Sequence, residues 1–476
     1  MLRTAPFSSL VSALWLSACD APGPSSAAAD TAAADASAAA DASAAPVADA
    51  APSGVDAVVP PRIVPEPGVD DTRDILSIDL TLDLTTYEAL AVVTVAPSLD
   101  TAASFDVGDL DILSVEDTAG PLNFRSARGR LAVGVPAGDA PVALTVRYRF
   151  QAQYAYDGWL PDYGVTFLWP YACGNLFPCH PDPAEGQRFS LNVTGGPPGT
   201  TLVYPREIPA DVPAYVPAIA AGEFTEIDLG TTAAGTRLRA WHLPGEGADM
   251  ATGTAPLRQV FDFLERTYGP YALGDTVGSV SANWEDDPTL GIEHHPFWHI
   301  GRADIDDPEV HAHEAAHGWF GDGVRIACWE DFVLSEGTTT YISARALASA
   351  GVDVWPDFGC YMAFLCDPAN ALNTVALPET CGEIDIGNHP LWSTVPYMKG
   401  AFFYRDVAAL LGDAAVDAVI ATFYQAHVGR AARMRDMLDA LSRAAGVNAP
   451  EVAALADRWL TALDCPASVS DLCPMP

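Results

Sequence analysis

The stretch His313-Glu314-Ala315-Ala316-His317 constrains this chain most, because its chemistry depends on one kind of local structure. On an α-helix, residues i and i+4 lie on one face about 6 Å apart, so both imidazoles can reach a single cation. The preceding Asp307-Pro308-Glu309 favours a helix here, since it offers an N-cap oxygen, a proline for the first position and an early acidic residue. We therefore predict a helix that holds a metal ion, with Glu314 as a general base.

A third ligand is expected downstream, because a catalytic zinc ion takes three protein ligands and keeps one position open. Glu336 follows His317 after a gap of 18 residues, in a run from Ser335 to Ala350 that is predicted to form a second helix against the first. His313, His317 and Glu336 are thus the predicted ligands of one zinc ion per chain.

The line HEAAHGWFGDGVRIACWEDFVLSEG, residues 313–337, resembles the aminopeptidase N and leukotriene hydrolase family of gluzincin zinc peptidases. That family uses two histidines and a glutamate with this same gap. An HExxH pattern alone also arises by chance, so the spaced glutamate and the tryptophan context favour the zinc site. The resemblance implies an α+β multidomain fold, with an N-terminal all-β, saddle-like domain followed by a thermolysin-like α/β catalytic domain.

Residues 290–294 resemble the family's G-x-M-E-N strand, whose glutamate binds the free α-amine of the substrate. Gly291 and Glu293 are kept, while Leu290, Ile292 and His294 depart from the pattern. The resemblance implies that Glu293 anchors the amine and that Gly291, Ile292 and His294 line the substrate cleft. Without it, Glu293 could be an ordinary carboxylate on an edge strand.

The segment from Val395 to Gly400 looks like the family's Y-x-K-G motif, in which the tyrosine hydroxyl stabilises the tetrahedral oxyanion. Tyr397 is therefore a second predicted catalytic residue, and a core tyrosine with a locally satisfied hydroxyl is the alternative. Lys399 is the only lysine in the chain, and its role could be structural.

Four further histidines lie near these segments, and none is predicted to bind the metal. His311 is two positions before His313, which turns it roughly 200° around a helix from that ligand. The others follow Glu293 and are expected to line the cleft, to pack or to form hydrogen bonds; they are His294, His295 and His299.

One departure from the family concerns recognition of the amine. Residues 175–183 resemble the family's F-P-C-x-D-x-P landmark, upstream of which the family places a glutamine or glutamate that also binds the α-amine. The family interval leads to Trp169, and no Gln or Glu lies between Asp162 and Asn175. This departure leaves room for an endopeptidase or another metallohydrolase of the same fold.

The net charge of −38 excludes nucleic acid as a partner, since nothing here could neutralise phosphates. The chain of 476 residues is long enough for two or three domains. We predict a β-rich domain over residues 62–240, with period-two strands at 78–84 and 142–150, and the catalytic domain over 241–465. A tail over 466–476 leaves no room for the C-terminal helical domain of many relatives.

Residues 1–19 read as a signal peptide, and Leu16-Ser17-Ala18-Cys19 resembles the lipobox of bacterial lipoproteins. The resemblance implies cleavage before Cys19, lipidation of its sulfur, and export to the periplasm or cell surface with a membrane anchor. Simple secretion is the alternative. Residues 20–61 are rich in Ala, Asp, Ser and Pro and are predicted to be a disordered linker.

Without Cys19, eight of the nine cysteines remain, an even number that fits four disulfides in an exported protein. Cys173 with Cys179, and Cys465 with Cys473, are close enough in sequence for local bridges, which we predict. The remaining cysteines stay unassigned at this point: Cys328, Cys360, Cys366 and Cys381.

These features together predict a zinc aminopeptidase that hydrolyses N-terminal residues from peptides, with Glu314 activating the attacking water. A non-catalytic surface lipoprotein that keeps the fold and the metal is an alternative from another class. The presence of both Glu314 and Tyr397 argues against it, because a binding protein would not need them.

Overall fold

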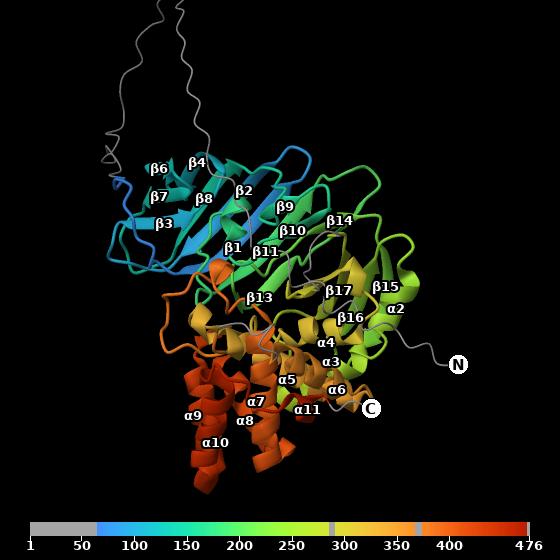
Figure 1. The fold of residues 1–476 in the computed structure, drawn as a ribbon. Coiled ribbons are helices and arrows are strands. Elements are labelled where there is room, and N and C mark those ends of the chain that lie inside the picture. Colours follow the sequence, from blue (N-terminus) through green and yellow to red (C-terminus); the bar gives the residue numbers. More distant parts are fainter. Residues whose placement is uncertain (1–63, 285–290, 367–373, 474–476) are drawn as a thin grey trace, which may run out of the picture. The chain divides into compact units, whose positions relative to one another are not determined.

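The computed structural model describes residues 64–284, 291–366 and 374–473, which belong to one compact unit (Figure 1). The predicted signal peptide, Cys19 and the predicted linker lie outside the described residues. Within the described part of the chain, no helix is both long and apolar enough to span a bilayer.

The first part of the described chain is built from β-strands, as the alternating pattern predicts. β1 (Ile75–Asp83) buries Ile78, Leu80 and Leu82 and pairs with β2 in antiparallel and β11 in parallel orientation. These three strands belong to a seven-stranded sheet. Its strand order is β13 (Glu207–Val212), β11 (Gln187–Thr194), β1, β2 (Glu88–Val95), β8 (Val142–Arg149), β4 (Asp111–Asp117) and β5 (Gly120–Pro121).

Two smaller sheets complete this β-rich part. The three-stranded sheet has the order β3 (Ala102–Asp106), β7 (Arg130–Gly134) and β6 (Phe124–Ala127). The four-stranded sheet has the order β12 (Thr201–Val203), β14 (Ala220–Gly222), β10 (Val165–Phe167) and β9 (Gly158–Leu160). A 3-10 turn, η1 (Ala172–Asn175), follows β10.

A five-stranded sheet leads into the region of the metal motif. Its order is β15 (Thr225–Thr231), β16 (Arg237–His242), β17 (Thr276–Ala282), β19 (Phe297–Gly301) and β18 (Gly291–Ile292). The sheet takes strands from both sides of position 240, where the boundary between the two domains is predicted. The short strand β18 pairs with β19 alone, so the sequence segment that ends in Glu293 lies at the edge of the sheet.

Helices make up most of the remaining chain. The predicted second metal helix is observed as α5, which begins three residues earlier than expected. The helices are α2 (Gly247–Gly253), α3 (Leu257–Tyr268), α4 (Pro308–Ala316), α5 (Phe332–Ser349), α6 (Trp355–Leu365), α7 (Thr394–Leu411), α8 (Asp413–His427), α9 (Met434–Ala445), α10 (Ala449–Ala456) and α11 (Val469–Leu472).

Short turns and one small sheet connect these helices. The two-stranded sheet joins β20 (Val324–Ile326) to β21 (Arg430–Ala432) in parallel orientation. The short helical turns are η2 (Arg302–Asp304), η3 (Trp329–Asp331), η4 (Ile386–Asn388), η5 (Gly446–Asn448) and η6 (Asp457–Thr461).

Helices α5 and α7 touch at a pair of glycines. A Cβ atom placed on Gly400 would lie 2.5 Å from the Cα of Gly337, and one placed on Gly337 would lie 2.7 Å from the Cα of Gly400. No side chain fits between backbones this close. The contact matters for the site, because Glu336 precedes one glycine and Tyr397 lies one helical turn before the other.

The disulfides correct one prediction. Cys173–Cys179 is confirmed, whereas the predicted Cys465–Cys473 bridge is wrong. Helix α6 carries Cys360, and Cys366 is its C-cap residue. The segment that contains Cys465 and Cys473 packs back against α6, so each of these two cysteines meets a partner on α6 or at its end. The other three bridges are Cys328–Cys381, Cys360–Cys473 and Cys366–Cys465.

Replacing Gly400 with alanine is expected to destabilise the fold by about 1–3 kcal/mol, because the added methyl group must push α7 away from α5. The measurement is the free energy of unfolding from denaturant titration. Gly138→Ala is the matched control, since a Cβ there meets nothing within 4 Å. Equal stability of the two variants would contradict the close contact.

Candidate metal centre and active site

Helix α4 and its C-cap residue provide the two predicted histidine ligands. The helix begins with the N-cap and the proline that the sequence predicts. The Asp307 side chain caps the helix by accepting a hydrogen bond from the backbone N–H of Glu309 at 2.9 Å, and Pro308 occupies the first position. The helix ends at Ala316, so His317 is its C-cap residue. The Nδ1 of His317 lies 3.0 Å from the Phe320 carbonyl oxygen, which fixes the proton on Nδ1 and leaves Nε2 free as a metal ligand.

Helix α5 brings Glu336 to the same point. Its Oε2 lies 3.2 Å from the Nε2 of His313 and 3.3 Å from the Nε2 of His317, and these two nitrogens lie 3.1 Å apart. All three side chains are buried. Burial alone would raise the pKa of Glu336, but His317 and His313 beside it lower the pKa to about 2. The predicted ligand set therefore converges in space.

This donor set fits a zinc ion. Zinc binds histidine nitrogens and carboxylate oxygens at about 2.0–2.2 Å in tetrahedral geometry, which places neighbouring ligand atoms about 3.3–3.5 Å apart. The observed separations of 3.1–3.3 Å are close to that spacing.

The carboxylate of Glu314 lies against the edge strand β18. A Cβ atom on Gly291 would come within 2.5 Å of the Glu314 Oε1, so a glycine is required where this side chain passes the strand. Burial raises the pKa of Glu314 well above its usual value, His317 lowers it, and Glu293 and Glu336 raise it further. A carboxylate with a raised pKa is suited to accept a proton.

Glu293 joins this group from the end of β18. Oxygen atoms of Glu293 and Glu314 and a ring nitrogen of His317 all lie within 4.8 Å of one another. Glu293 is buried, with only 6% of its surface exposed, so it is no ordinary surface carboxylate. The structure therefore brings the predicted amine anchor to the predicted metal ligands.

Tyr397 flanks the centre from α7. Its ring stacks on that of His313, with centroids 5.5 Å apart and an angle of 18° between the planes. Burial raises the pKa of Tyr397 well above its usual value, and Glu336, Glu293 and Glu314 raise it further, so the hydroxyl stays protonated as a hydrogen-bond donor. That protonation state is the one an oxyanion donor requires.

The same region matches a known protein family. Residues 304–459 match the family described as "Peptidase family M1 domain". This match and the donor set of the site together indicate zinc as the cofactor.

Curated relatives match only part of their own length. "Leucine aminopeptidase 2" of Candida glabrata is 26% identical over 266 residues, which cover 50% of this chain and 39% of the relative. "Aminopeptidase RNPEPL1" of mouse is 31% identical over 195 residues, which cover 36% of this chain and 25% of the relative. The chain thus spans well under half of each of these relatives.

Solved structures show the fold. The M1 zinc metallopeptidase of Deinococcus radiodurans superposes with a TM-score of 0.70 at 18% identity, covering 83% of this chain and 94% of that chain. Yeast LTA4 hydrolase superposes with a TM-score of 0.67 at 18% identity, covering 81% of this chain and 67% of that chain. The predicted fold, a β-rich N-terminal part followed by a thermolysin-like α/β catalytic domain, is confirmed.

Two residues near the centre have no counterpart in the sequence analysis. Tyr215 comes from the loop between β13 and β14, and its side chain forms a hydrogen bond with Glu293. Burial raises the pKa of Glu293 above its usual value, and the Tyr215 hydrogen bond offsets part of that rise. Asp322 follows the zinc helix, is fully buried, and has no hydrogen-bond partner for either side-chain oxygen among the described residues. Tyr215 could not be found by motif, because it lies 78 residues before its partner and outside every quoted segment.

The other histidines are held by hydrogen bonds away from the metal ligands. His311 lies 2.8 Å from both the Ser279 hydroxyl and the Ile305 carbonyl oxygen, and burial lowers its pKa to about 4. His295 lies 2.8 Å from the Tyr271 hydroxyl and 2.8 Å from the backbone oxygen of Glu314. These two residues are structural supports of α4.

His294 is more enclosed than a cleft-lining residue needs to be. Its Nδ1 lies 3.1 Å from the Nδ1 of His299, and its exposed fraction is 1%. Ile292 is also buried, at 8%. Their contact with substrate stays a prediction.

Lys399 has a structural contact. Its ammonium group donates a hydrogen bond of 2.7 Å to the backbone oxygen of Ala462 and so ties α7 to the segment after η6. Burial lowers the pKa of Lys399, and Asp464 raises it in part.

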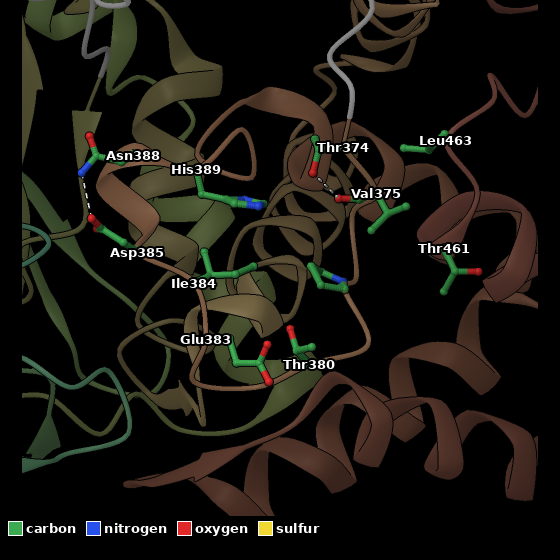
Figure 2. Close-up of a pocket in the computed structure, with 11 residues that line it drawn as sticks. Thr374, Val375, Thr380, Glu383, Ile384, Asp385, Asn388, His389, Thr461 and Leu463 are labelled. Atoms are coloured by element: carbon green, nitrogen blue, oxygen red, sulfur yellow. Dashed lines mark hydrogen bonds between the residues drawn. The ribbon is translucent and has the colours of Figure 1, made fainter.

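A cavity of about 740 Å³ is lined by residues other than those of the metal centre (Figure 2). None of the predicted ligand or catalytic residues lines it. Its walls come from segment 374–389 and from the residues after α10: Thr374, Val375, Pro378, Thr380, Glu383, Ile384, Asp385, Asn388, His389, Thr461 and Leu463.

Replacing Glu336 with alanine is expected to weaken zinc binding by more than about 100-fold, because even partners of metal ligands contribute 10–100-fold. Zinc affinity is measured by competition with a chromophoric chelator, and circular dichroism confirms the fold. Asp306→Asn, an exposed carboxylate beside α4, is the matched control. Unchanged zinc affinity in the Glu336 variant would remove this residue from the ligand set.

Proposed function

We propose that this chain is a zinc aminopeptidase that removes N-terminal residues from peptides. One observation carries the proposal: the Glu293 carboxylate lies within 4.8 Å of a ligand histidine and of Glu314. In a peptide cleaved after its first residue, the α-ammonium group and the scissile carbonyl belong to that same residue and so lie close together. A buried carboxylate this close to the metal ligands suits a free amine far better than the interior of a longer chain.

Each residue has a defined task in this proposal. When bound, zinc supplies a Lewis acid that polarises the scissile carbonyl and acidifies water. Glu314 accepts the proton of the attacking water and transfers it to the leaving amine. The Tyr397 hydroxyl donates to the developing oxyanion, and Glu293 pairs with the substrate's α-ammonium and so sets the point of cleavage.

The relatives support the reaction class. Those with 24–31% identity carry the names leucine aminopeptidase and aminopeptidase, and one Deinococcus radiodurans structure is described as bound to a Tyr-Ser-Ala substrate. Trp169 keeps an endopeptidase as the second candidate, because it stands where the resembled family has an amine-binding glutamine or glutamate.

We also propose that the protein is exported from a bacterial cell and anchored through a lipid on Cys19, in the periplasm or at the cell surface. The lipobox-like Leu16-Ser17-Ala18-Cys19 supports the anchor. The four disulfides of the described chain support an oxidising compartment. Labelling with a radioactive fatty acid, compared between the native chain and Cys19→Ala, tests the anchor, and equal labelling would contradict it.

The activity is tested with aminoacyl-arylamides and N-acetylated copies of them. Hydrolysis of the free-amine substrates alone is expected, with loss on chelation and recovery with zinc. Glu293→Ala is expected to lower kcat/KM for the free amines by about 30- to 5000-fold, since a buried charge partner contributes about 2–5 kcal/mol. Equal cleavage of acetylated substrates would favour the endopeptidase, and bound zinc without any cleavage would favour a binding role.

Glu314→Gln is expected to bind zinc normally but to lose about 100- to 10,000-fold in kcat, because the amide cannot accept the proton of water. Zinc content and kcat are measured on the same preparation. Asp306→Asn again serves as a carboxyl-to-amide control. Activity near that of the native protein would rule out Glu314 as the base.

A further inference from the structure

Three aromatic side chains form a continuous surface beside the metal centre. We call Trp169, Phe332 and Trp392 the aromatic wall. The ring of Trp169 lies 6.4 Å from that of Phe332 and 4.7 Å from that of Trp392, measured between centroids. Trp329 packs against Trp169, with 5.7 Å between the centroids of the two rings.

The inner end of the wall reaches the catalytic residues. Phe332 lies 6.0 Å from the ring of Tyr397, with the two rings edge to face. Tyr397 in turn stacks on the ligand His313. Only the Tyr397 side chain therefore separates the inner end of the wall from His313, beside which the scissile carbonyl must lie.

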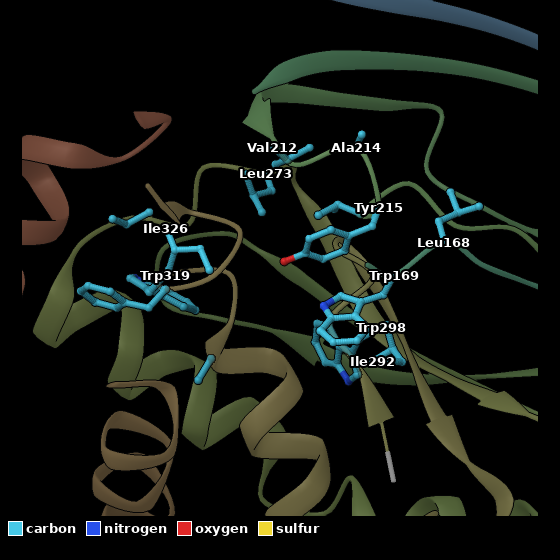
Figure 3. Packing of buried hydrophobic residues seen from close by; sticks show 14 of the residues in the cluster. Leu168, Trp169, Val212, Ala214, Tyr215, Leu273, Ile292, Trp298, Trp319 and Ile326 are labelled. Carbon is cyan, nitrogen blue, oxygen red and sulfur yellow. The ribbon is translucent and has the colours of Figure 1, made fainter. Parts of the chain in front are cut away.

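The wall also lies on the side of Glu293. Phe167, at the end of β10 and two residues before Trp169, contacts the ring of His294 at 6.4 Å. His294 directly follows Glu293. Figure 3 shows Trp169 and Ile292 in one close-up of the buried core. Only Tyr397 separates Phe332 from His313, and Glu293 lies within 4.8 Å of the neighbouring His317. A substrate held by its α-amine at Glu293 therefore has its first residue next to this surface.

The outer end of the wall reaches solvent. Trp392 is 49% exposed, whereas Trp169 is 6% exposed. Tyr171, which contacts Trp329, is also 40% exposed. Half-exposed large aromatic rings continuous with a buried site are typical of a surface that covers a ligand. The three rings of the wall carry no charge that could pair with a charged side chain of the substrate.

We infer that the aromatic wall receives the side chain of the substrate's first residue and selects aromatic over small or charged residues. The inference rests on the proposed aminopeptidase function. Aromatic rings pack favourably against one another edge to face or offset, in addition to the area that they bury. A charged first side chain would lose its water here without gaining a partner.

The test compares kcat/KM for phenylalanyl-, alanyl- and glutamyl-arylamides, which share one leaving group. The phenylalanyl substrate is expected to exceed the alanyl substrate by at least about ten-fold, the least that one methylene is worth in an apolar pocket. Trp392→Ala is expected to lower this ratio to about 3 or less, and Trp392→Phe to keep most of it. Tyr154→Ala, which alters a 71% exposed ring elsewhere, is the control and should keep the full ratio.

The possible outcomes separate this inference from the proposed function. If no arylamide is cleaved although zinc is bound, the aminopeptidase proposal fails. If all three are cleaved, but the alanyl or glutamyl substrate is preferred or Trp392→Ala leaves the ratio unchanged, the inference fails while the aminopeptidase stands. A variant that fails to fold is recognised by circular dichroism, and Trp392→Phe then decides through its ratio.

Discussion

The contact between Gly337 and Gly400 is the constraint on which the geometry of the centre depends. Two backbones that touch at these glycines fix the path of both helices at this point. The predicted ligand Glu336 directly precedes Gly337 on α5. The proposed oxyanion donor Tyr397 lies three residues before Gly400 on α7 and shares its helix face. Because no side chain separates the backbones, little freedom remains to move the ligand away from the donor.

The centre gathers negative charge with little positive charge of its own. Glu293, Glu314, Asp322 and Glu336 are all buried, and the nearest basic groups are the two ligand histidines. Such an arrangement is costly in a low-dielectric interior unless cations complete it. A zinc ion and the α-ammonium of a peptide are two cations that would do so, which explains why the site tolerates this many carboxylates.

Local features of the centre could be predicted from sequence, and features that depend on distant contacts could not. The spacing of His313 and His317 fixes one helix face, and the strand alternation at Ile78 and Val142 reflects a period of two; both depend on neighbours in the chain. The disulfide partners of Cys465 and Cys473 depend on how the end of the chain packs against α6. Tyr215 meets Glu293 from the loop between β13 and β14, 78 residues earlier in the chain, so no spacing rule could have linked them.

The residues proposed to contact the substrate do not all lie in the segment that matches the M1 family. That segment begins at residue 304 and contains the predicted metal ligands, the proposed base and the proposed oxyanion donor. Trp169 and Tyr215, however, come from before residue 220, and Glu293 comes from the edge of a sheet that begins at β15. A fragment that begins at residue 304 would keep the residues proposed to hydrolyse the peptide bond. It would lose the residues proposed to bind the substrate and so to determine which bond is cleaved.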